Sequence, residues 1–271
     1  MYKIGFSSCC FPPFMPIEDI IKFCIDQGFN ALELEVNDTN FNAASVKSPT
    51  LEWIKKLGTQ KDIYFSMHSP GSINFSDPDP EKRADAEVKV TASIHWAAEL
   101  GVKTIVVHPG RVIGDFTQES WKLALNQNIT AIKSCAQLAD LLGVTVSVEN
   151  LCHEKGSVNP NISKFFEMCT SIGLSHIKIT LDTNHAGLVD GLAESVKVIG
   201  PYVNHIHFSS NKGIKSDHCE PQVGVIDFYS IADFLKNFKG MIIIELNESG
   251  EDSAEAILRT REYLVKLLNA E

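Results

Sequence analysis

Short runs of apolar, often β-branched residues alternate along the chain with longer stretches in which apolar residues recur at helical spacing. This pattern predicts strands at residues 3–7, 30–36, 63–67, 104–107, 145–148, 177–181, 203–208 and 241–246. It predicts helices at residues 17–27, 50–57, 80–100, 117–142, 162–172, 192–199, 228–238 and 253–268. Strand–helix units repeated eight times close most simply into an α/β barrel of parallel strands, the (β/α)8 or TIM barrel.

The length of the chain agrees with one such barrel. A (β/α)8 barrel takes about 250 residues, and the 271 residues here, 44% of them hydrophobic, can bury one large core. We therefore expect a single domain over residues 1–271. A doubly wound open sheet is the alternative, but no glycine-rich phosphate-binding fingerprint follows the first strand to support it.

Side chains that can bind metals stand at the ends of six successive predicted strands. These residues are His68, His108, Glu149, Asp182, His207 and Glu245. In a parallel barrel the carboxyl ends of all strands meet at one mouth, so these side chains should gather there. So many ionisable groups in one cavity would cost several kcal/mol in desolvation and repulsion unless a cation neutralises them. The sequence therefore predicts a divalent-metal site.

Two further histidines follow in the loops beyond the strands. His185 comes three residues after Asp182, so an acid at a strand end and an imidazole on the next turn can face one cation. His218 lies in the loop after the seventh strand. Nitrogen and oxygen donors of this kind suit Zn, Mn, Co or Fe, and the eight candidate ligands would serve one to three ions. Any one histidine, taken alone, is more often a hydrogen-bonded structural residue.

Three charged residues near the expected mouth are candidates for substrate binding. Glu35 ends the second strand, while Arg111 and Lys212 come soon after the histidines of the fourth and seventh strands and could hold a phosphate. The alternative for each is a solvated charge on the rim. His205 should lie one layer deeper in the barrel than His207, in a packed and hydrogen-bonded role.

Composition narrows the classes of partner and compartment. The formal net charge of -10 argues against a surface built mainly to hold nucleic-acid phosphates. Seven cysteines without metal-finger spacing suit reduced thiols in a cytosol. No signal peptide precedes the first predicted strand, and no apolar run approaches the roughly 20 residues of a membrane span. We expect a cytoplasmic protein with no membrane partner, and the oligomeric state stays open, a homo-oligomer included.

Taken together, the strand-end residues resemble those of the xylose isomerase-like TIM barrel superfamily, which includes sugar isomerases, sugar epimerases and endonuclease IV (AP endonuclease family 2). The segment 218–227, His-Cys-Glu-Pro-Gln-Val-Gly-Val-Ile-Asp, is similar to the family's segment in which a histidine precedes a proline and a glycine followed shortly by Ile-Asp. The resemblance spans nearly the whole chain. It implies a basic metal site made by Glu149, Asp182, His207 and Glu245.

The sugar isomerase and epimerase branch uses one divalent ion to hold two adjacent oxygens of a small sugar or polyol and to acidify the neighbouring C–H. The resemblance implies that Glu149 and Glu245 are the catalytic pair, which removes and returns a proton through an enediolate. His68, His108 and His185 would then bind substrate hydroxyls or line a second cation. We expect this function, with a small-molecule sugar as the partner.

The endonuclease IV branch is the alternative, a zinc phosphodiesterase that cleaves DNA at abasic sites with a cluster of three ions. Its extra ligands would be His68 and His108, which share Glu149, and a third set of His185, His218 and an adjacent acid. Nucleic acid is a partner only under this alternative. The pair at residues 71–72, Gly-Ser, argues against it, because these side chains are too small to hold a DNA stack open.

Overall fold

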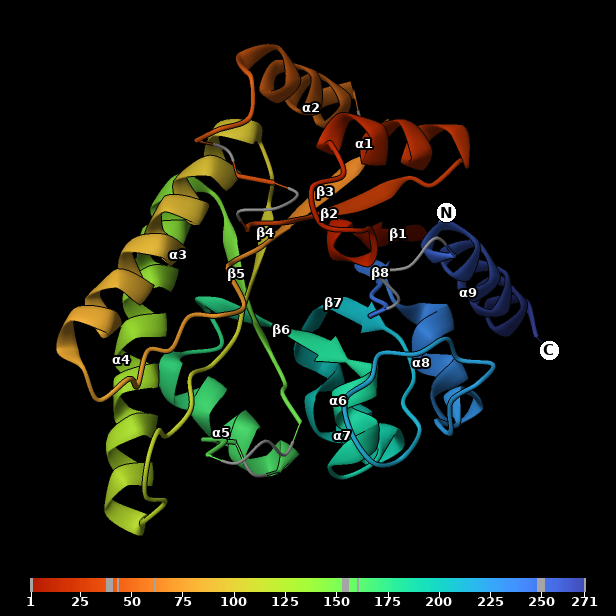
Figure 1. Ribbon diagram of the computed structural model, residues 1–271. Coiled ribbons are helices and arrows are strands. Elements are labelled where there is room, and N and C mark those ends of the chain that lie inside the picture. The colour runs from red at the N-terminus through yellow and green to blue at the C-terminus, as the bar shows by residue number, and fades with distance from the viewer. Residues whose placement is uncertain are drawn as a thin grey trace.

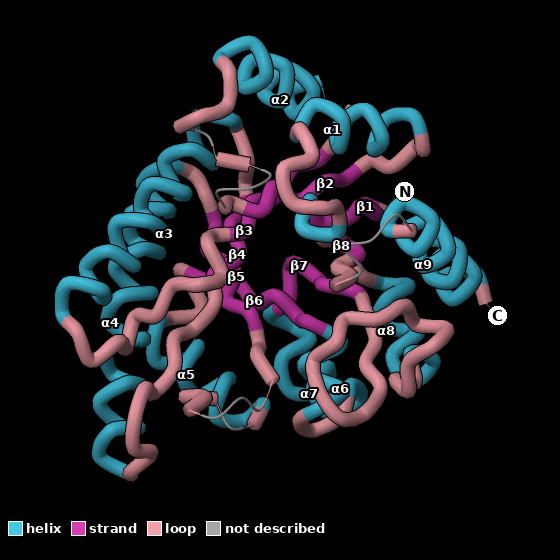
Figure 2. Tube along the Cα trace, in the orientation of Figure 1, coloured by secondary structure: helices cyan, strands magenta, loops and turns pink. Residues whose placement is uncertain are grey.

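In the part of the chain that the structure describes, eight parallel strands form a closed barrel in the order of the sequence (Figure 2). The strands are β1 (Lys3–Ser7), β2 (Ala31–Glu35), β3 (Tyr64–His68), β4 (Thr104–Val107), β5 (Thr145–Glu149), β6 (Ile177–Asp182), β7 (Val203–Phe208) and β8 (Met241–Ile244). The structure is a computed structural model and describes residues 2–37, 41–42, 44–60, 62–152, 156–159, 161–247 and 252–270. The pairing of β8 with β1 closes the barrel, which confirms the predicted fold.

Helices surround the barrel on its outside (Figure 1). The α-helices are α1 (Ile17–Asp26), α2 (Ser48–Gln60), α3 (Pro80–Leu100), α4 (Gln118–Leu142), α5 (Ile162–Ile172), α6 (Thr183–Leu188), α7 (Leu192–Ile199), α8 (Ala232–Asn237) and α9 (Ser253–Asn269). Short 3-10 turns are η1 (Ser8–Cys10), η2 (Gly200–Tyr202) and η3 (Phe228–Ile231). The predicted helices are confirmed, but residues 228–238 are divided between η3 and α8, and α6 was not predicted.

Local sequence signals fix the ends of the two longest helices, α3 and α4, which run side by side in Figures 1 and 2. The Asp79 carboxylate accepts a hydrogen bond from the backbone N–H of Glu81, and Pro80 occupies the first turn of α3. Gly101 ends this helix with φ 76°, a left-handed conformation that glycine adopts without a steric penalty.

A membrane-spanning helix combines great length with high hydropathy, and none of the helices in the described part of the chain has both.

The apolar core lies mainly between the strands and the helices, and this leaves the barrel interior free for polar groups. Side chains of a strand alternate between its two faces. Leu32 and Leu34 of β2 therefore join the outer core, where both are fully buried. Inside the barrel, Ala31, Met241 and Ile243 form only a small apolar cluster near the amino ends of the strands. The interior above that cluster holds the site.

Candidate metal centre

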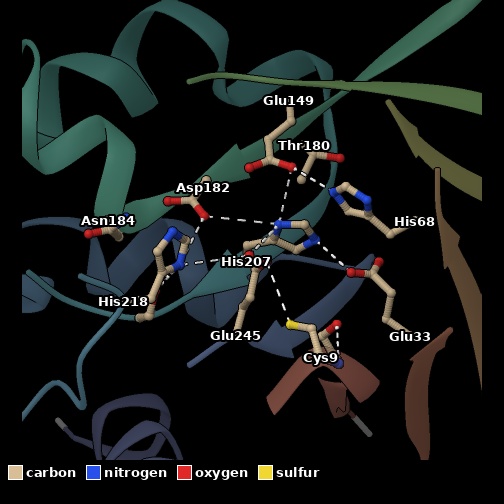
Figure 3. A network of polar contacts seen from close by, with 12 residues as sticks. Cys9, Glu33, His68, Glu149, Thr180, Asp182, Asn184, His207, His218 and Glu245 are labelled. Carbon is tan, nitrogen blue, oxygen red and sulfur yellow. Dashed lines mark hydrogen bonds and ion pairs between the residues drawn. The ribbon is translucent and has the colours of Figure 1, made fainter. Parts of the chain in front are cut away.

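The carboxyl ends of the strands bring eight predicted ligands together in three groups of side chains, six of which are labelled in Figure 3. The central group is Glu149, Asp182, His207 and Glu245; a second is His68, His108 and Glu149; a third is Asp182, His185 and His218. Within each group the ligand atoms all lie within 4.8 Å of one another. Because two acids are shared between groups, the three groups form one continuous centre.

The central group is built around the imidazole of His207. Its Nδ1 lies 2.9 Å from Glu245 Oε2, 3.3 Å from Glu149 Oε2 and 4.0 Å from Asp182 Oδ2. His207 Nδ1, Asp182 Oδ2 and Glu245 Oε2 are all buried without a hydrogen-bond partner among the described residues. Buried polar atoms in such a position are costly unless a ligand or ion satisfies them, so this donor set fits a divalent cation.

The second group has the spacing of a zinc-sized site. His68 Nε2 lies 3.2 Å from His108 Nε2, and Glu149 Oε2 lies 3.4 Å and 3.1 Å from these two nitrogens. A tetrahedral ion with bonds of about 2.0–2.1 Å keeps its ligand atoms about 3.3–3.4 Å apart. His68 Nδ1 donates to the carbonyl oxygen of Ser69 at 2.6 Å, which leaves its Nε2 free to accept.

The third group is the loosest of the three. His218 Nδ1 lies 3.9 Å from both Asp182 Oδ2 and Glu245 Oε2. His185 is held more firmly, because its backbone N–H donates to Asp182 Oδ1 at 2.7 Å, where the strand-end acid caps α6. His218 itself has φ 40°, which is uncommon outside glycine.

The acid of this third group is Asp182 rather than either residue just before His218. Ser216 Oγ accepts a hydrogen bond from Asn184 Nδ2 at 2.7 Å. Asp217 Oδ1 accepts one from the backbone N–H of Lys212 at 3.2 Å. Neither side chain belongs to the described ligand groups.

The three carboxylates of the centre differ in how readily they ionise. Burial disfavours ionisation of Glu149, but His108 and His207 outweigh it and hold the pKa of this carboxyl well below its usual range. Burial is likewise outweighed at Glu245, where His207 lowers the pKa to about 2. At Asp182 burial prevails and raises the pKa. Two acids whose ionisation is favoured therefore flank a third whose ionisation is disfavoured.

The imidazoles carry the balancing positive charge when no metal ion is bound. Burial opposes protonation of His68, but Glu35 and Glu149 outweigh it and raise its pKa to about 10. Asp182 and Glu149 do the same for His185 and raise its pKa to about 9. The centre thus needs positive charge, which a divalent ion would supply in place of these protons.

A pocket of about 580 Å³ opens beside the centre, between the loops that follow β3, β4 and β5. His108 and His185 form part of its wall, and Arg111 lies at its exposed side. Glu35 lies deeper, with Oε2 3.3 Å from His68 Nδ1. Lys212 is exposed and does not line this pocket. The pocket is thus the natural approach of a small molecule to the centre.

Sequence reasoning missed the place of Glu33 in the site. Glu33 is fully buried below the centre, where its two oxygens contact His205 and His207. A signal for this role was available in the sequence, because Glu33 is an acidic residue in the middle of β2, on the face that points into the barrel. The Cys9 thiol, in η1, donates toward Glu245 Oε1 at 4.0 Å. His205 is buried one layer deeper than His207, in agreement with the packed role expected of it.

A family model described as a xylose isomerase-like TIM barrel matches residues 21–267 of the chain. The uncharacterized protein MJ1311 of Methanocaldococcus jannaschii is 25% identical over 276 residues, covering 97% of this chain and 89% of that protein. A probable endonuclease 4 of Mycobacterium leprae (strain TN) is 25% identical over 233 residues, covering 81% of this chain and 87% of that protein.

Solved structures share the fold at lower sequence identity. The crystal structure of a D-tagatose 3-epimerase-like protein has a TM-score of 0.83 and 20% identity, and the match covers 98% of both chains. The crystal structure of IolI protein with a binding zinc atom has a TM-score of 0.83 and 16% identity, again over 98% of both chains. At these identities the likeness establishes the fold of the chain.

Proposed function

The chain belongs to the xylose isomerase-like TIM barrel family, and from this membership we propose that it is a divalent-metal-dependent sugar isomerase or epimerase. Its substrate would be a small sugar or related polyol, in which a proton is moved through an enediolate. The likeness in fold to a D-tagatose 3-epimerase-like protein supports a sugar substrate. The likeness to IolI protein with a binding zinc atom supports a metal ion.

The observation that carries this proposal is the placement of Glu149 and Glu245 on either side of His207 (Figure 3). Glu149 ends β5 and Glu245 directly follows β8, so the two carboxylates reach the centre from different walls of the barrel. Both pKa values are held below their usual range, so each carboxylate is ionised near neutral pH and can accept a proton. An isomerase or epimerase needs such a pair to remove and return the proton.

Four residues would hold the ion: Glu149, Asp182, His207 and Glu245. Their buried unpartnered atoms are the evidence that the donor set fits it: Asp182, His207 and Glu245 each contribute one, and Glu149 Oε2 lies 3.3 Å from that of His207. Nitrogen and oxygen donors suit Zn, Mn, Co or Fe. When bound, such an ion polarises a carbonyl oxygen and lowers the pKa of the adjacent C–H.

The remaining chemistry belongs to the side chains. A sugar entering the pocket would meet His108 and His185, whose ring nitrogens can bond its hydroxyls. Arg111 would meet any charged group at the exposed side of the pocket. Either Glu149 or Glu245 removes the proton from a substrate carbon. A proton is then returned to the enediolate by the same carboxylate or by the other one. Glu245 is the more accessible of the two, with 17% of its side chain exposed against 1% for Glu149.

Replacing Glu245 by glutamine tests this proposal. We expect Glu245→Gln to slow proton exchange at least 100-fold, because general base catalysis contributes about 10²–10⁴-fold. The measurement is incorporation of deuterium from D2O into a panel of ketoses and aldoses, followed by NMR with added Mn or Zn. Glu262→Gln, an exposed acid on α9, is the matched control and should exchange at the wild-type rate. Unchanged exchange in Glu245→Gln would remove this residue from proton transfer.

A second candidate is an endonuclease IV-like zinc phosphodiesterase acting at abasic DNA sites. One specific observation favours it: two further ligand groups share Glu149 and Asp182 with the central group, and adjacent ions can clamp a phosphate. The 3.9 Å contacts of His218 and the small Gly71 beside His108 weigh against it. Nicking of an abasic duplex by zinc-loaded protein, without deuterium entry into any sugar, would replace the first proposal with this one.

A further inference from the structure

A buried carboxylate lies one layer below the metal centre, and we propose that it positions His207 as a metal ligand. Glu33 projects from β2 into the barrel, where its Oε1 lies 2.9 Å from His207 Nε2. Its Oε2 lies 2.8 Å from Nε2 of His205. In Figure 3, Glu33 lies on the side of the His207 ring away from Glu149 and Asp182. This inference rests on the metal site of the proposed function and adds a residue outside that site.

The two nitrogens of the His207 ring face different partners. Nδ1 faces Glu245 Oε2 at 2.9 Å and Glu149 Oε2 at 3.3 Å, whereas Nε2 faces Glu33. An ionised carboxylate can only accept hydrogen bonds. When an ion in the central group takes the lone pair of Nδ1, the single hydrogen of a neutral His207 belongs on Nε2, where Glu33 faces it. A carboxylate behind a ligating histidine fixes both the ring orientation and the ligating nitrogen.

The surroundings of Glu33 keep it charged although it has no contact with solvent. It is fully buried, and an isolated carboxylate at that depth would cost several kcal/mol. Two ring nitrogens face its oxygens at 2.8 Å and 2.9 Å, and each can carry the hydrogen that an ionised carboxylate accepts. The Ser66 hydroxyl also donates to Oε2 at 2.9 Å. The layer is therefore arranged around an ionised carboxylate, which a purely space-filling position would not require.

Glu33, His205 and His207 do not themselves form a second metal site of the kind inferred above. Their atoms lie close enough to be considered as a ligand group. The Glu33 oxygens lie 2.8 Å and 2.9 Å from the two ring nitrogens, and the Ser66 hydroxyl already donates to Oε2 at 2.9 Å. None of the three residues is exposed to solvent, and His207 turns its other nitrogen to the central group. We therefore assign Glu33 to supporting the histidines rather than to sharing an ion with them.

Zinc affinity, measured by competition with a chromophoric chelator, tests the inference on two variants. Glu33→Gln keeps the side-chain volume and removes the charge, and Glu33→Leu removes both oxygens. We expect each to weaken zinc binding about 10–100-fold, the usual cost of losing a residue behind a metal ligand. Ser147→Ala is the matched control, since its hydroxyl lies inside the barrel but bonds Asn204 and Thr180 instead. It should bind zinc with wild-type affinity.

A second measurement separates positioning from simple loss of stability. In zinc-loaded protein with ¹⁵N-labelled histidine, NMR should find the His207 hydrogen on Nε2 in the wild type, and Glu33→Leu should lose or shift that signal. Thermal unfolding in chelator confirms that the variants fold. Wild-type zinc affinity in both variants, or a wild-type hydrogen on Nδ1, would overturn the inference and leave the metal centre standing. A wild-type protein that takes up neither Zn nor Mn would overturn both proposals at once.

Discussion

Glu35 occupies an intermediate place at the edge of the centre, between the ligands and the solvent. Its Oε2 lies 3.3 Å from His68 Nδ1, and 15% of its side chain is exposed. Burial raises its pKa, His68 opposes this, and Glu245 and Glu33 add to it, with a result of about 8. Without a metal ion, this carboxyl is therefore largely protonated at neutral pH, where Glu149 supplies the negative charge that keeps the pKa of His68 raised. A neutral acid beside His68 can donate a hydrogen bond as well as accept one.

This raised pKa gives the metal-free protein a defined dependence on pH. Between about pH 4.3, the usual glutamate pKa, and pH 8, the folded protein keeps a proton that the unfolded chain has released. The free energy of unfolding therefore falls as pH rises through this window. Glu35→Gln has no carboxyl group to titrate, so it should not lose stability in this way. The difference in free energy of unfolding, variant minus wild type, should therefore grow between pH 5 and pH 8. The gain should be roughly 1–3 kcal/mol, at about 1.4 kcal/mol per pKa unit with neighbouring charges readjusting.

Urea unfolding of chelator-treated protein at the two pH values measures this difference. The exposed acid Glu52 on α2 provides the control, and Glu52→Gln should show no such trend. A difference between Glu35→Gln and wild type that stays constant with pH would contradict the account of this residue.

At the residue scale, the sequence was informative wherever a residue's type and position in its strand were enough. The meeting of His68 and Glu149 could be predicted because each stands at a strand end, and all strand ends of a parallel barrel meet. The role of Glu33 depends on which side chains of β7 face it across the barrel, and this follows from register and tilt rather than from spacing. The position of Lys212 could not be predicted, because it depends on the path of the long loop after β7. In the structure this side chain is exposed to solvent.

At the element scale, the loops after β3 and β4 are tied together beside the pocket. Asn74 Oδ1 accepts from the backbone N–H of Arg111 at 2.9 Å, and Asn74 Nδ2 donates to the Arg111 carbonyl at 2.9 Å. The backbone N–H of Gly110 donates to Asn128 Oδ1 of α4 at 2.5 Å. These bonds hold the segment that follows His108, so they set the shape of the pocket wall.

Removing the Asn74 side chain should therefore loosen the pocket. Asn74→Ala leaves the two backbone groups of Arg111 without this partner, and we expect a loss of about 1–2 kcal/mol in the free energy of unfolding. In the sugar reaction the effect should appear mainly as a higher KM, because Asn74 lines the wall of the pocket and does not belong to the proton-transfer pair. Steady-state kinetics would measure it, with the exposed Asn126→Ala on α4 as control. An unchanged KM would show that this wall does not meet the substrate.

Elements with strong end signals could be predicted to the residue, whereas α6 could not. The bounds of α3 follow from a capping aspartate, an initial proline and a terminal glycine. Helix α6 has only six residues, too few for a periodic pattern, and it begins because the Asp182 carboxylate at the strand end accepts from the backbone N–H of His185. The residues of the site thus create this helix, and spacing alone indicates no more than a turn.

At the scale of the whole molecule, the barrel gathers acids and imidazoles from most of its strands into one interior. The apolar core is largely outside the strands, so the inner layers can be polar without loss of that core. The closed order of the strands then decides which residues meet, as β8 returns to β1 beside β2. A cation at the mouth would neutralise groups contributed by distant parts of the chain, which links metal binding to the stability of the fold.

Metal stoichiometry tests most directly whether a metal centre serves sugar chemistry in this protein. Elemental analysis should be made on protein purified without chelator or affinity tag. We expect one tightly held divalent ion per chain, bound by Glu149, Asp182, His207 and Glu245 and lost in Glu149→Ala. Close to three ions per chain would instead make His68, His108, His185 and His218 ligands and favour phosphoester cleavage. No bound ion, and none taken up from Zn or Mn, would contradict the account.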